Sequence, residues 1–406
     1  MPGKEKNRFV KLCLLTMGAY PVPATEGGAV ETLVEWMAET YQKGCFSCSL
    51  DIISKDAVPA RERAARYGKV AFHFIRYPAI AMKGYRILKR VVRKLSGATP
   101  VRCNPYFSQA LRLIRKNRYD VVVVENAIWY VRPLKQHCSS RVILHLHNDA
   151  ADLAGTLGAA LARQADGIMA VSDFVAGKLR REPGMPQVVT VKNAIDIPSF
   201  WGDTATKRQA ERIRRKFGFS PDDVVCLFVG RLIPEKGIDA LIDAVGKLDG
   251  CHIKLLVVGG AAFRDSGQTD FAASLYRKAE TLGGRVAFAG YVEYQKLPPY
   301  YHACDIAVFP SQCNEAAGLV VLEAQSAGKP VVIARSGGMP EYVCGVSAQI
   351  VETGAGFSDR LADALRAIGS SQPLRRRMGA AGAAYAAEFD KSGYFAKILD
   401  AIEQMI

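Results

Sequence analysis

Strand-like apolar runs alternate with helical segments along almost the whole chain of 406 residues. We expect a first series of strands near residues 11–16, 48–54, 70–75, 120–125, 141–147 and 167–172, and a second near 224–229, 253–258, 286–290, 305–309 and 330–334. Helices between short apolar strands are typical of parallel sheets that are covered on both faces. The pattern therefore predicts an α/β protein with two doubly wound, Rossmann-like parallel-sheet domains.

A polar and basic segment, residues 204–216, separates the two series of strands. We therefore place an N-terminal domain at residues 1–200 and begin a C-terminal domain at residue 201. The length of the chain and its hydrophobic fraction of 49% are sufficient to build both cores.

The positive charge of the chain is concentrated in its first half. Residues 1–200 contain 30 Lys and Arg against 16 Asp and Glu, whereas the remainder contains 24 against 23. Within the first half, the segment from Lys83 to Leu95 interleaves cations with aliphatic side chains at helical spacing. A basic amphipathic helix of this kind suits an anionic membrane surface, and the same pattern fits an ordinary half-buried surface helix.

Several other classes of protein are disfavoured by the sequence. No apolar run approaches the length of a membrane span, and the apolar piece from Leu12 to Met17 is too short for a signal peptide. We therefore expect a cytoplasmic protein, either free or peripheral on the inner face of the cell membrane. Ten cysteines in so long a chain do not form a disulfide scaffold. No nucleic-acid-binding signature accompanies the positive charge, so nucleic acid is not an expected partner.

Two carboxylates flank a glycine at a predicted helix start. Glu315 comes just after the expected strand at 305–309, and Glu323 lies eight residues further on, with Gly318 between them. Free N–H groups and the helix dipole favour a phosphate there, and a glycine lets the ligand approach closely. Carboxylates on either side can bind hydroxyls, and eight helical positions would span roughly 12 Å. The pattern predicts a site for a nucleotide-linked sugar, although two glutamates on a helix surface have the same spacing.

A second phosphate-type signal lies where the expected strand at 224–229 ends. Gly230 closes that strand, and Arg231 and Lys236 follow in the next loop. Ligands of open α/β sheets bind beyond the carboxyl ends of the strands, so both cations are expected in the ligand crevice. Arg offers a planar fork to phosphate oxygens and Lys a point charge, whereas a solvated basic loop is the alternative.

These elements occur in the order found in retaining glycosyltransferase family 4, and the chain is similar to that family over nearly its whole length. The shared elements are Gly-Arg-Leu at 230–232, Glu-Lys-Gly at 235–237, the paired glutamates, and Gly-Lys-Pro-Val-Val at 328–332. The resemblance implies the GT-B fold, with two Rossmann-like domains that face an interdomain cleft. It further implies that residues 1–200 bind the acceptor, that residues 201–389 bind the nucleotide-sugar, and that a helix at about 390–406 crosses back onto the first domain.

The resemblance also assigns roles in the second domain. Arg231 and Lys236 would hold the diphosphate and stabilise the charge that builds as the sugar bond breaks, so that neither a metal nor another cofactor is required. Glu315 would bind the sugar hydroxyls and Glu323 the ribose hydroxyls. Further donor contacts would come from Gly27, Gly28, Val292, Ala317, Gly318, Leu319 and Val320. Gly27 and Gly28 could equally form only a turn.

His147 is the predicted contribution of the first domain. It ends the expected strand at 141–147 and matches the active-site histidine of the family, whereas its neighbour His145 is expected to be a core histidine. Asn148 and Asp149 follow at the strand end, where they would contact the acceptor or the donor sugar. The candidate catalytic residues are therefore His147, Arg231, Lys236 and Glu315.

The sequence looks most like bacterial enzymes of surface-polysaccharide or lipopolysaccharide assembly. The resemblance implies retaining, metal-independent transfer from a nucleotide-sugar, with UDP-N-acetylglucosamine or a UDP-hexose ahead of dTDP- and GDP-sugars. The acceptor would be a lipid-linked glycan, a polysaccharide or a lipopolysaccharide. Two other functions stay open, which are a nucleotide-sugar 2-epimerase on the same fold and a non-catalytic nucleotide-sugar-binding protein.

Overall fold

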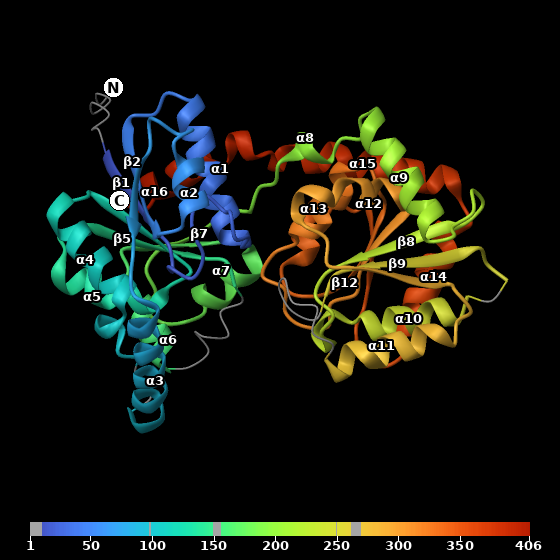
Figure 1. The fold of residues 1–406 in the computed structure, drawn as a ribbon, viewed down its shortest axis with the longest axis horizontal. Coiled ribbons are helices and arrows are strands. Elements are labelled where there is room, and N and C mark those ends of the chain that lie inside the picture. Colours follow the sequence, from blue (N-terminus) through green and yellow to red (C-terminus); the bar gives the residue numbers. More distant parts are fainter. Residues whose placement is uncertain (1–9, 97–98, 149–155, 249, 261–268) are drawn as a thin grey trace. The chain divides into compact units, whose positions relative to one another are not determined.

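The computed structural model describes residues 10–96, 99–148, 156–248, 250–260 and 269–406. The chain divides into two compact units (Figure 1). Unit 1 consists of Met1–Asn193 and Lys391–Ile406, and unit 2 of Ala194–Asp390. The structure thus divides the chain between Asn193 and Ala194, whereas the sequence analysis places the boundary at residues 200 and 201.

Unit 1 is built on one parallel sheet with the strand order β3-β2-β1-β4-β5-β6-β7. Its strands are β1 (Val10–Leu15), β2 (Cys48–Lys55), β3 (Ala71–Ile75), β4 (Val121–Glu125), β5 (Arg141–Leu146), β6 (Gly167–Ala170) and β7 (Val188–Thr190). Its helices are α1 (Ala29–Lys43), α2 (Val58–Ala64), α3 (Ala79–Ser96), α4 (Pro105–Asn117), α5 (Val131–His137), α6 (Thr156–Ala162), α7 (Asp173–Arg180) and α16 (Tyr394–Glu403).

Unit 2 repeats the architecture with a parallel sheet of order β10-β9-β8-β11-β12-β13. Its strands are β8 (Val224–Val229), β9 (Ile253–Val258), β10 (Val286–Gly290), β11 (Ile306–Phe309), β12 (Val331–Ala334) and β13 (Ala348–Val351). Its helices are α8 (Ile197–Phe200), α9 (Thr204–Lys216), α10 (Ile238–Gly246), α11 (Asp270–Glu280), α12 (Pro298–Ala303), α13 (Leu319–Ser326), α14 (Phe357–Gly369) and α15 (Gln372–Ala386).

This arrangement confirms the predicted fold class of two doubly wound parallel sheets. The central strands are buried on both faces, as β4, β11 and β12 show along their whole length. Apolar runs of this kind are stabilised mainly by the burial of their side chains between two helical layers. Each of the expected strands is present, whereas β7 and β13 are absent from the sequence analysis. Both are short, partly exposed and paired on one side only, so their apolar signal is weak.

In each sheet the strand order reverses between two central strands. In unit 1 the reversal lies between β1 and β4, and in unit 2 between β8 and β11. Chain connections leave to opposite sides at such a point, which opens a crevice at the carboxyl ends of the strands. The two signals that follow β8 and β11 in the sequence are therefore placed at the same edge of the unit 2 sheet.

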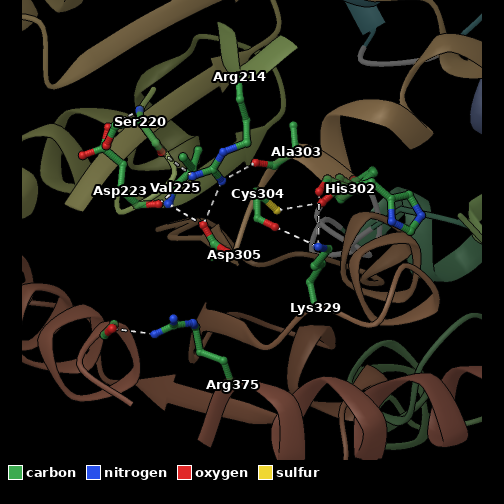
Figure 2. A network of polar contacts seen from close by, with 12 residues as sticks. Arg214, Ser220, Asp223, Val225, His302, Ala303, Cys304, Asp305, Lys329 and Arg375 are labelled. Atoms are coloured by element: carbon green, nitrogen blue, oxygen red, sulfur yellow. Dashed lines mark hydrogen bonds and ion pairs between the residues drawn. The ribbon is translucent and has the colours of Figure 1, made fainter. Parts of the chain in front are cut away.

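The opposite edge of the unit 2 sheet is held by Arg214 of α9 (Figure 2). Its Nη1 donates to the carbonyl oxygen of Ala303 at 3.0 Å and to Asp305 Oδ2 at 3.1 Å. Its Nη2 donates to the carbonyl oxygens of Ser220 at 3.0 Å and Asp223 at 2.7 Å. One guanidinium therefore ties α9 to the segments that enter β8 and β11.

Replacing Arg214 with methionine should destabilise unit 2 by about 2–4 kcal/mol, because the variant keeps the apolar stem but leaves three partly buried acceptors without this donor. Faster hydrogen exchange of the β8 and β11 amides would report this loss for unit 2 alone. The exposed neighbour Arg215 is the matched control, and Arg215→Met should leave exchange unchanged. Equal exchange in the two variants would contradict the anchoring role of Arg214.

The last helix of the chain belongs to unit 1 (Figure 1). Phe395 of α16 makes edge-to-face contacts with Tyr41 and Phe46, with ring centroids 5.6 and 4.9 Å apart. Just before the helix, Lys391 Nζ lies 2.8 Å from Glu39 Oε2 of α1. Residues that follow unit 2 in the sequence thus complete the core of the unit that contains β1.

Candidate functional site

The loops after β8 and β11 meet at the carboxyl edge of the unit 2 sheet. Lys236 ends a short 3-10 helix, Pro234–Lys236, and is followed by Gly237 in the left-handed conformation with φ 67°. A Cβ atom on Gly237 would collide with the carbonyl oxygen of Pro310, so only glycine allows the two loops to approach this closely. The Gln312 amide then donates to the carbonyl oxygen of Glu235 at 2.8 Å.

This contact brings Lys236 and Glu315 together as an ion pair. Both side chains are largely buried, with 22% of Lys236 and 18% of Glu315 exposed. The Ser311 hydroxyl donates to the same carboxylate oxygen, Oε1, at 2.6 Å, and the Gly338 amide donates to the carbonyl oxygen of Glu315 at 2.6 Å. Glu315 is therefore fixed by side-chain and backbone contacts, and its contacts within the described residues leave Oε2 open to a ligand.

The amino end of α13 adjoins this pair in the sequence. Gly318 is the N-cap residue, and α13 begins at Leu319. The first helical amides, including those of Leu319 and Val320, have no carbonyl partner within the helix and can bind an anion. The segment from Glu315 to Gly318 is not helical. The helical distance of roughly 12 Å between Glu315 and Glu323 therefore does not apply, because it required the whole span to be helical and its first half is loop.

Glu323 lies one turn into α13 and is buried. Its Oε2 accepts a hydrogen bond from the Tyr301 hydroxyl of α12 at 2.7 Å. Burial raises the pKa of Glu323 to about 7, although the Tyr301 hydrogen bond acts in the opposite direction. Near neutral pH this carboxyl is thus poised between its neutral and ionised forms.

The other residues of unit 2 that are predicted to contact the donor form no hydrogen bond or ion pair with Lys236 or Glu315 within the described residues. Arg231 follows β8 and is exposed. Ala317 is half-buried in the loop before α13. Val292 lines a cavity of about 630 Å³ between α9, the loop after β10 and α12. The lining of that cavity includes Tyr291 and Tyr300 but none of the carboxylates of the Glu315–Glu323 segment.

In unit 1, the predicted glycine loop follows β1 and leads into α1. Gly27 and Gly28 have φ of 85° and 103°, a conformation that side chains other than glycine rarely adopt. Gly28 is the N-cap of α1, and the end of the Glu31 side chain occupies the space where a Cβ of Gly28 would lie. Burial, together with a smaller contribution from the charge of Glu125, raises the pKa of Glu31 to about 7.

His147 contacts Glu125, the last residue of the adjacent strand β4. The His147 Nε2 atom lies 2.8 Å from Glu125 Oε2, and both side chains are buried. His145, which we expected to be a core histidine, is fully buried and also approaches Glu125 Oε2, with its Nδ1 at 3.0 Å. Asn148 is exposed, and Asp149 lies outside the described residues.

The trio of Glu125, His145 and His147 is also a potential metal-binding group within the described residues, because its ligating atoms lie within 4.8 Å of one another. The geometry favours hydrogen bonding. Both imidazoles direct a nitrogen at the same carboxylate oxygen, and the contact from His147 has the geometry of a hydrogen bond. A metal ion would instead have to lie between the three side chains and be bound by a lone pair from each ring and from the carboxylate.

Four residues of these sites escaped the sequence analysis, namely Glu31, Glu125, Tyr301 and Ser311. Two of them carry a signal that could have been used. Glu125 directly ends an apolar strand next to the strand of His147, and Glu31 opens the helix after Gly28. Ser311 follows β11 and Tyr301 lies in α12, and neither position has a distinctive sequence pattern.

Two family models match the chain and together cover most of it. The model described as "Glycosyltransferase Family 4" matches residues 58–198, and the model described as "Glycosyl transferases group 1" matches residues 209–385. One relative is the lipopolysaccharide 1,2-N-acetylglucosaminetransferase of Salmonella typhimurium, which is 23% identical over 82% of this chain and 82% of its own length. Another is the D-inositol 3-phosphate glycosyltransferase of Mycolicibacterium smegmatis, 35% identical over 50% of this chain and 46% of its own.

The solved structures agree with the fold. The Anabaena protein Alr3699/HepE, crystallised with UDP and glucose, superimposes with a TM-score of 0.73 at 20% identity, covering 97% of this chain and 99% of that one. A glycosyltransferase of lipopolysaccharide biosynthesis, WaaG, gives a TM-score of 0.65 at 17% identity. With the family models, the order of the motifs and the two doubly wound sheets in agreement, the chain belongs to glycosyltransferase family 4 and has the GT-B fold.

Proposed function

We propose that the protein is a retaining, metal-independent glycosyltransferase that moves a sugar from a UDP-sugar to a lipid-linked or lipopolysaccharide glycan. The observation that carries the proposal is the Lys236–Glu315 ion pair at the β8–β11 reversal, next in sequence to the free amides of α13. A cation and helix amides bind a diphosphate, and a fixed carboxylate binds sugar hydroxyls. This is the set of groups that a nucleotide-sugar requires.

The proposed reaction needs charge stabilisation rather than a protein nucleophile. The bond between the sugar C1 and the phosphate oxygen breaks, and negative charge develops on the departing diphosphate. Lys236, Arg231 and the α13 amides would stabilise that charge without a metal ion. The acceptor hydroxyl forms the new bond to C1 on the face that the diphosphate leaves, and a phosphate oxygen takes its proton, so the configuration is retained.

The choice of donor and acceptor is supported by the similar proteins. The Anabaena structure contains UDP and glucose, and the name of the Salmonella relative specifies transfer of N-acetylglucosamine to lipopolysaccharide. UDP-glucose and UDP-N-acetylglucosamine are therefore the first donors to compare, and a lipopolysaccharide core glycan the first acceptor.

Donor binding and slow donor hydrolysis across UDP-, GDP- and dTDP-sugars, measured in EDTA, test this function before an acceptor is known. One nucleotide-sugar should bind and be hydrolysed, and Glu315→Ala should lose hydrolysis. The exposed Glu352, which pairs with Arg335 at the surface, supplies the control variant Glu352→Ala. Interconversion of the sugar would instead show an epimerase, binding without turnover a binding protein, and a strict need for Mg²⁺ would contradict the metal-free mechanism.

The proposed acceptor also gives a role to α3 of unit 1. The helix exposes an apolar stripe, in which Ile80 and Leu95 are 80% and 81% exposed, beside a row of cations. The remaining exposed members of the stripe are Ile87, Leu88 and Val91, and the cations are Lys83, Arg86, Lys89, Arg90, Arg93 and Lys94. Exposed aliphatics flanked by cations suit the surface of an anionic membrane. Among the described helices, none is long and apolar enough to cross a bilayer.

Neutralising Arg86, Lys89, Arg90 and Arg93 together should abolish salt-sensitive binding to vesicles that contain anionic lipid, because each cation near such a surface contributes about 1 kcal/mol. Co-sedimentation with anionic and with neutral vesicles measures the change. A matched set of four exposed cations on unit 2, Arg208, Arg366, Arg376 and Arg377, serves as the control. Undiminished binding of the α3 variant to anionic vesicles would show that α3 is an ordinary surface helix.

A further inference from the structure

The contact between Glu125 and His147 bears on the protonation of the His147 ring as well as on its position. Glu125 is fully buried, and its Oε2 lies 2.8 Å from His147 Nε2. Burial alone would raise the pKa of Glu125, but the neighbouring His145 and His147 lower it to about 2. Burial lowers the pKa of His147 to about 4. Near neutral pH an ionised carboxylate therefore faces a neutral imidazole.

An ionised carboxylate accepts hydrogen bonds and donates none, so the atom that faces it must carry the proton. The single proton of neutral His147 is then on Nε2, and Nδ1 carries a lone pair. Within the described residues, His147 Nδ1 is buried and has no hydrogen-bond partner. A buried acceptor without a partner is costly, which points to a ligand donor at this atom.

Three titratable groups surround His147 within the described part of unit 1. Two of them, Glu125 from β4 and His145 from β5, act on His147 itself, and the third, Glu31 from α1, acts on Glu125. The His145 ring lies 4.1 Å from that of His147, centroid to centroid, but its nitrogens form no hydrogen bond with aligned geometry. Glu125 is thus the residue that controls the proton of His147.

We propose that Glu125 is a positioning residue that holds His147 in the Nε2–H tautomer, so that Nδ1 accepts a hydrogen bond from a hydroxyl of the bound sugar. The role of the sugar hydroxyl rests on the proposed glycosyltransferase function, whereas the tautomer is a property of the free protein. His147 then acts as a neutral acceptor. It neither donates to the sugar nor supplies positive charge to the diphosphate.

Nitrogen-15 NMR of the histidine rings tests the tautomer in the free protein, without substrate. The signal missing from His147→Gln identifies His147 among the six histidines. We expect one protonated nitrogen, Nε2, and one unprotonated nitrogen, Nδ1, throughout pH 6–8. A proton on Nδ1, or titration of His147 within that range, would overturn the proposal whatever the activity of the protein.

Glu125→Gln removes the carboxylate but keeps its size, and its amide can donate to His147. We expect a shift toward the Nδ1–H tautomer and a loss of kcat/KM of roughly 10- to 100-fold, in line with other partners that orient a functional histidine. Asp51 offers a matched carboxylate–imidazole pair in the same sheet, with Asp51 Oδ2 2.7 Å from His73 Nε2. Asp51→Asn should alter the His73 signal and leave His147 and kcat/KM unchanged. An unchanged tautomer and unchanged kcat/KM in Glu125→Gln would contradict the proposal.

Discussion

Replacing Lys236 with alanine is expected to lower kcat about 100- to 1000-fold. Losses of this size are usual when an enzyme loses one preorganised group that stabilises the charge developing on the leaving group. Lys236 is part of the Glu315 ion pair in the free protein and lies at the sheet edge where the diphosphate is proposed to bind. The loss should be the same in EDTA as in buffer with Mg²⁺, because the lysine and not a metal supplies the charge. Turnover of a nucleotide-sugar by wild type and variant measures it.

Part of such a loss could arise from Glu315, which the variant leaves partly buried without its cation. The double variant Lys236→Ala with Glu315→Gln removes that uncompensated charge, so it should recover stability but not turnover. Lys247 at the end of α10 is the control, because it pairs with Asp359 at the surface, at 2.5 Å. Activity near the wild-type level in Lys236→Ala would remove Lys236 from the mechanism.

Replacing Glu323 with alanine should weaken donor binding by 1.5–3 kcal/mol, or about 10- to 150-fold, since the ribose hydroxyls would lose a charged acceptor. The raised pKa of about 7 adds a pH dependence. The folded-state pKa lies above the ordinary value of 4.5, so burial of Glu323 costs no stability below that pH, and stability is lost as pH rises from there to about 7. A donor that binds the ionised form should therefore bind more tightly at pH 8 than at pH 6.

Calorimetry in buffers of different ionisation enthalpy would show the proton that Glu323 releases on binding. Tyr301→Phe is the informative companion, because it keeps the carboxyl but removes the hydrogen bond that lowers its pKa. The midpoint of the pH dependence should move upward in that variant. A donor affinity that is independent of pH in wild type, or unchanged in Glu323→Ala, would exclude Glu323 from the ribose site.

The sequence predicts the strands well because their apolar runs are local. The run Val121 to Val124 is buried in the middle of a sheet, and its apolar character alone identifies a strand. The meeting of the loops after β8 and β11 could be predicted because the carboxyl ends of parallel strands lie at the same edge of a sheet, where ligands bind. Strands at sheet edges, such as β7, are too short and too exposed to leave the same pattern.

What the sequence could not show depends on the register between neighbouring strands of the sheet. Glu125 meets His147 because β4 and β5 are parallel neighbours with Glu125 opposite His145. The two aligned residues are twenty positions apart in the sequence, and their alignment cannot be predicted from that spacing. The unusual state of Glu31 and Glu323 likewise arises from burial by other elements, which a single sequence does not reveal.

The place of α16 in unit 1 has a consequence for the order of synthesis. A ribosome makes α16 only after the whole of unit 2, yet Phe395 of that helix packs against the rings of Tyr41 and Phe46 of unit 1. Domains generally fold as units while the chain emerges, and the first one made usually folds first. Here unit 1 stays incomplete until unit 2 has been synthesised. The first strand of unit 1 is therefore made before that of unit 2, but the last residues of unit 1 are made after those of unit 2.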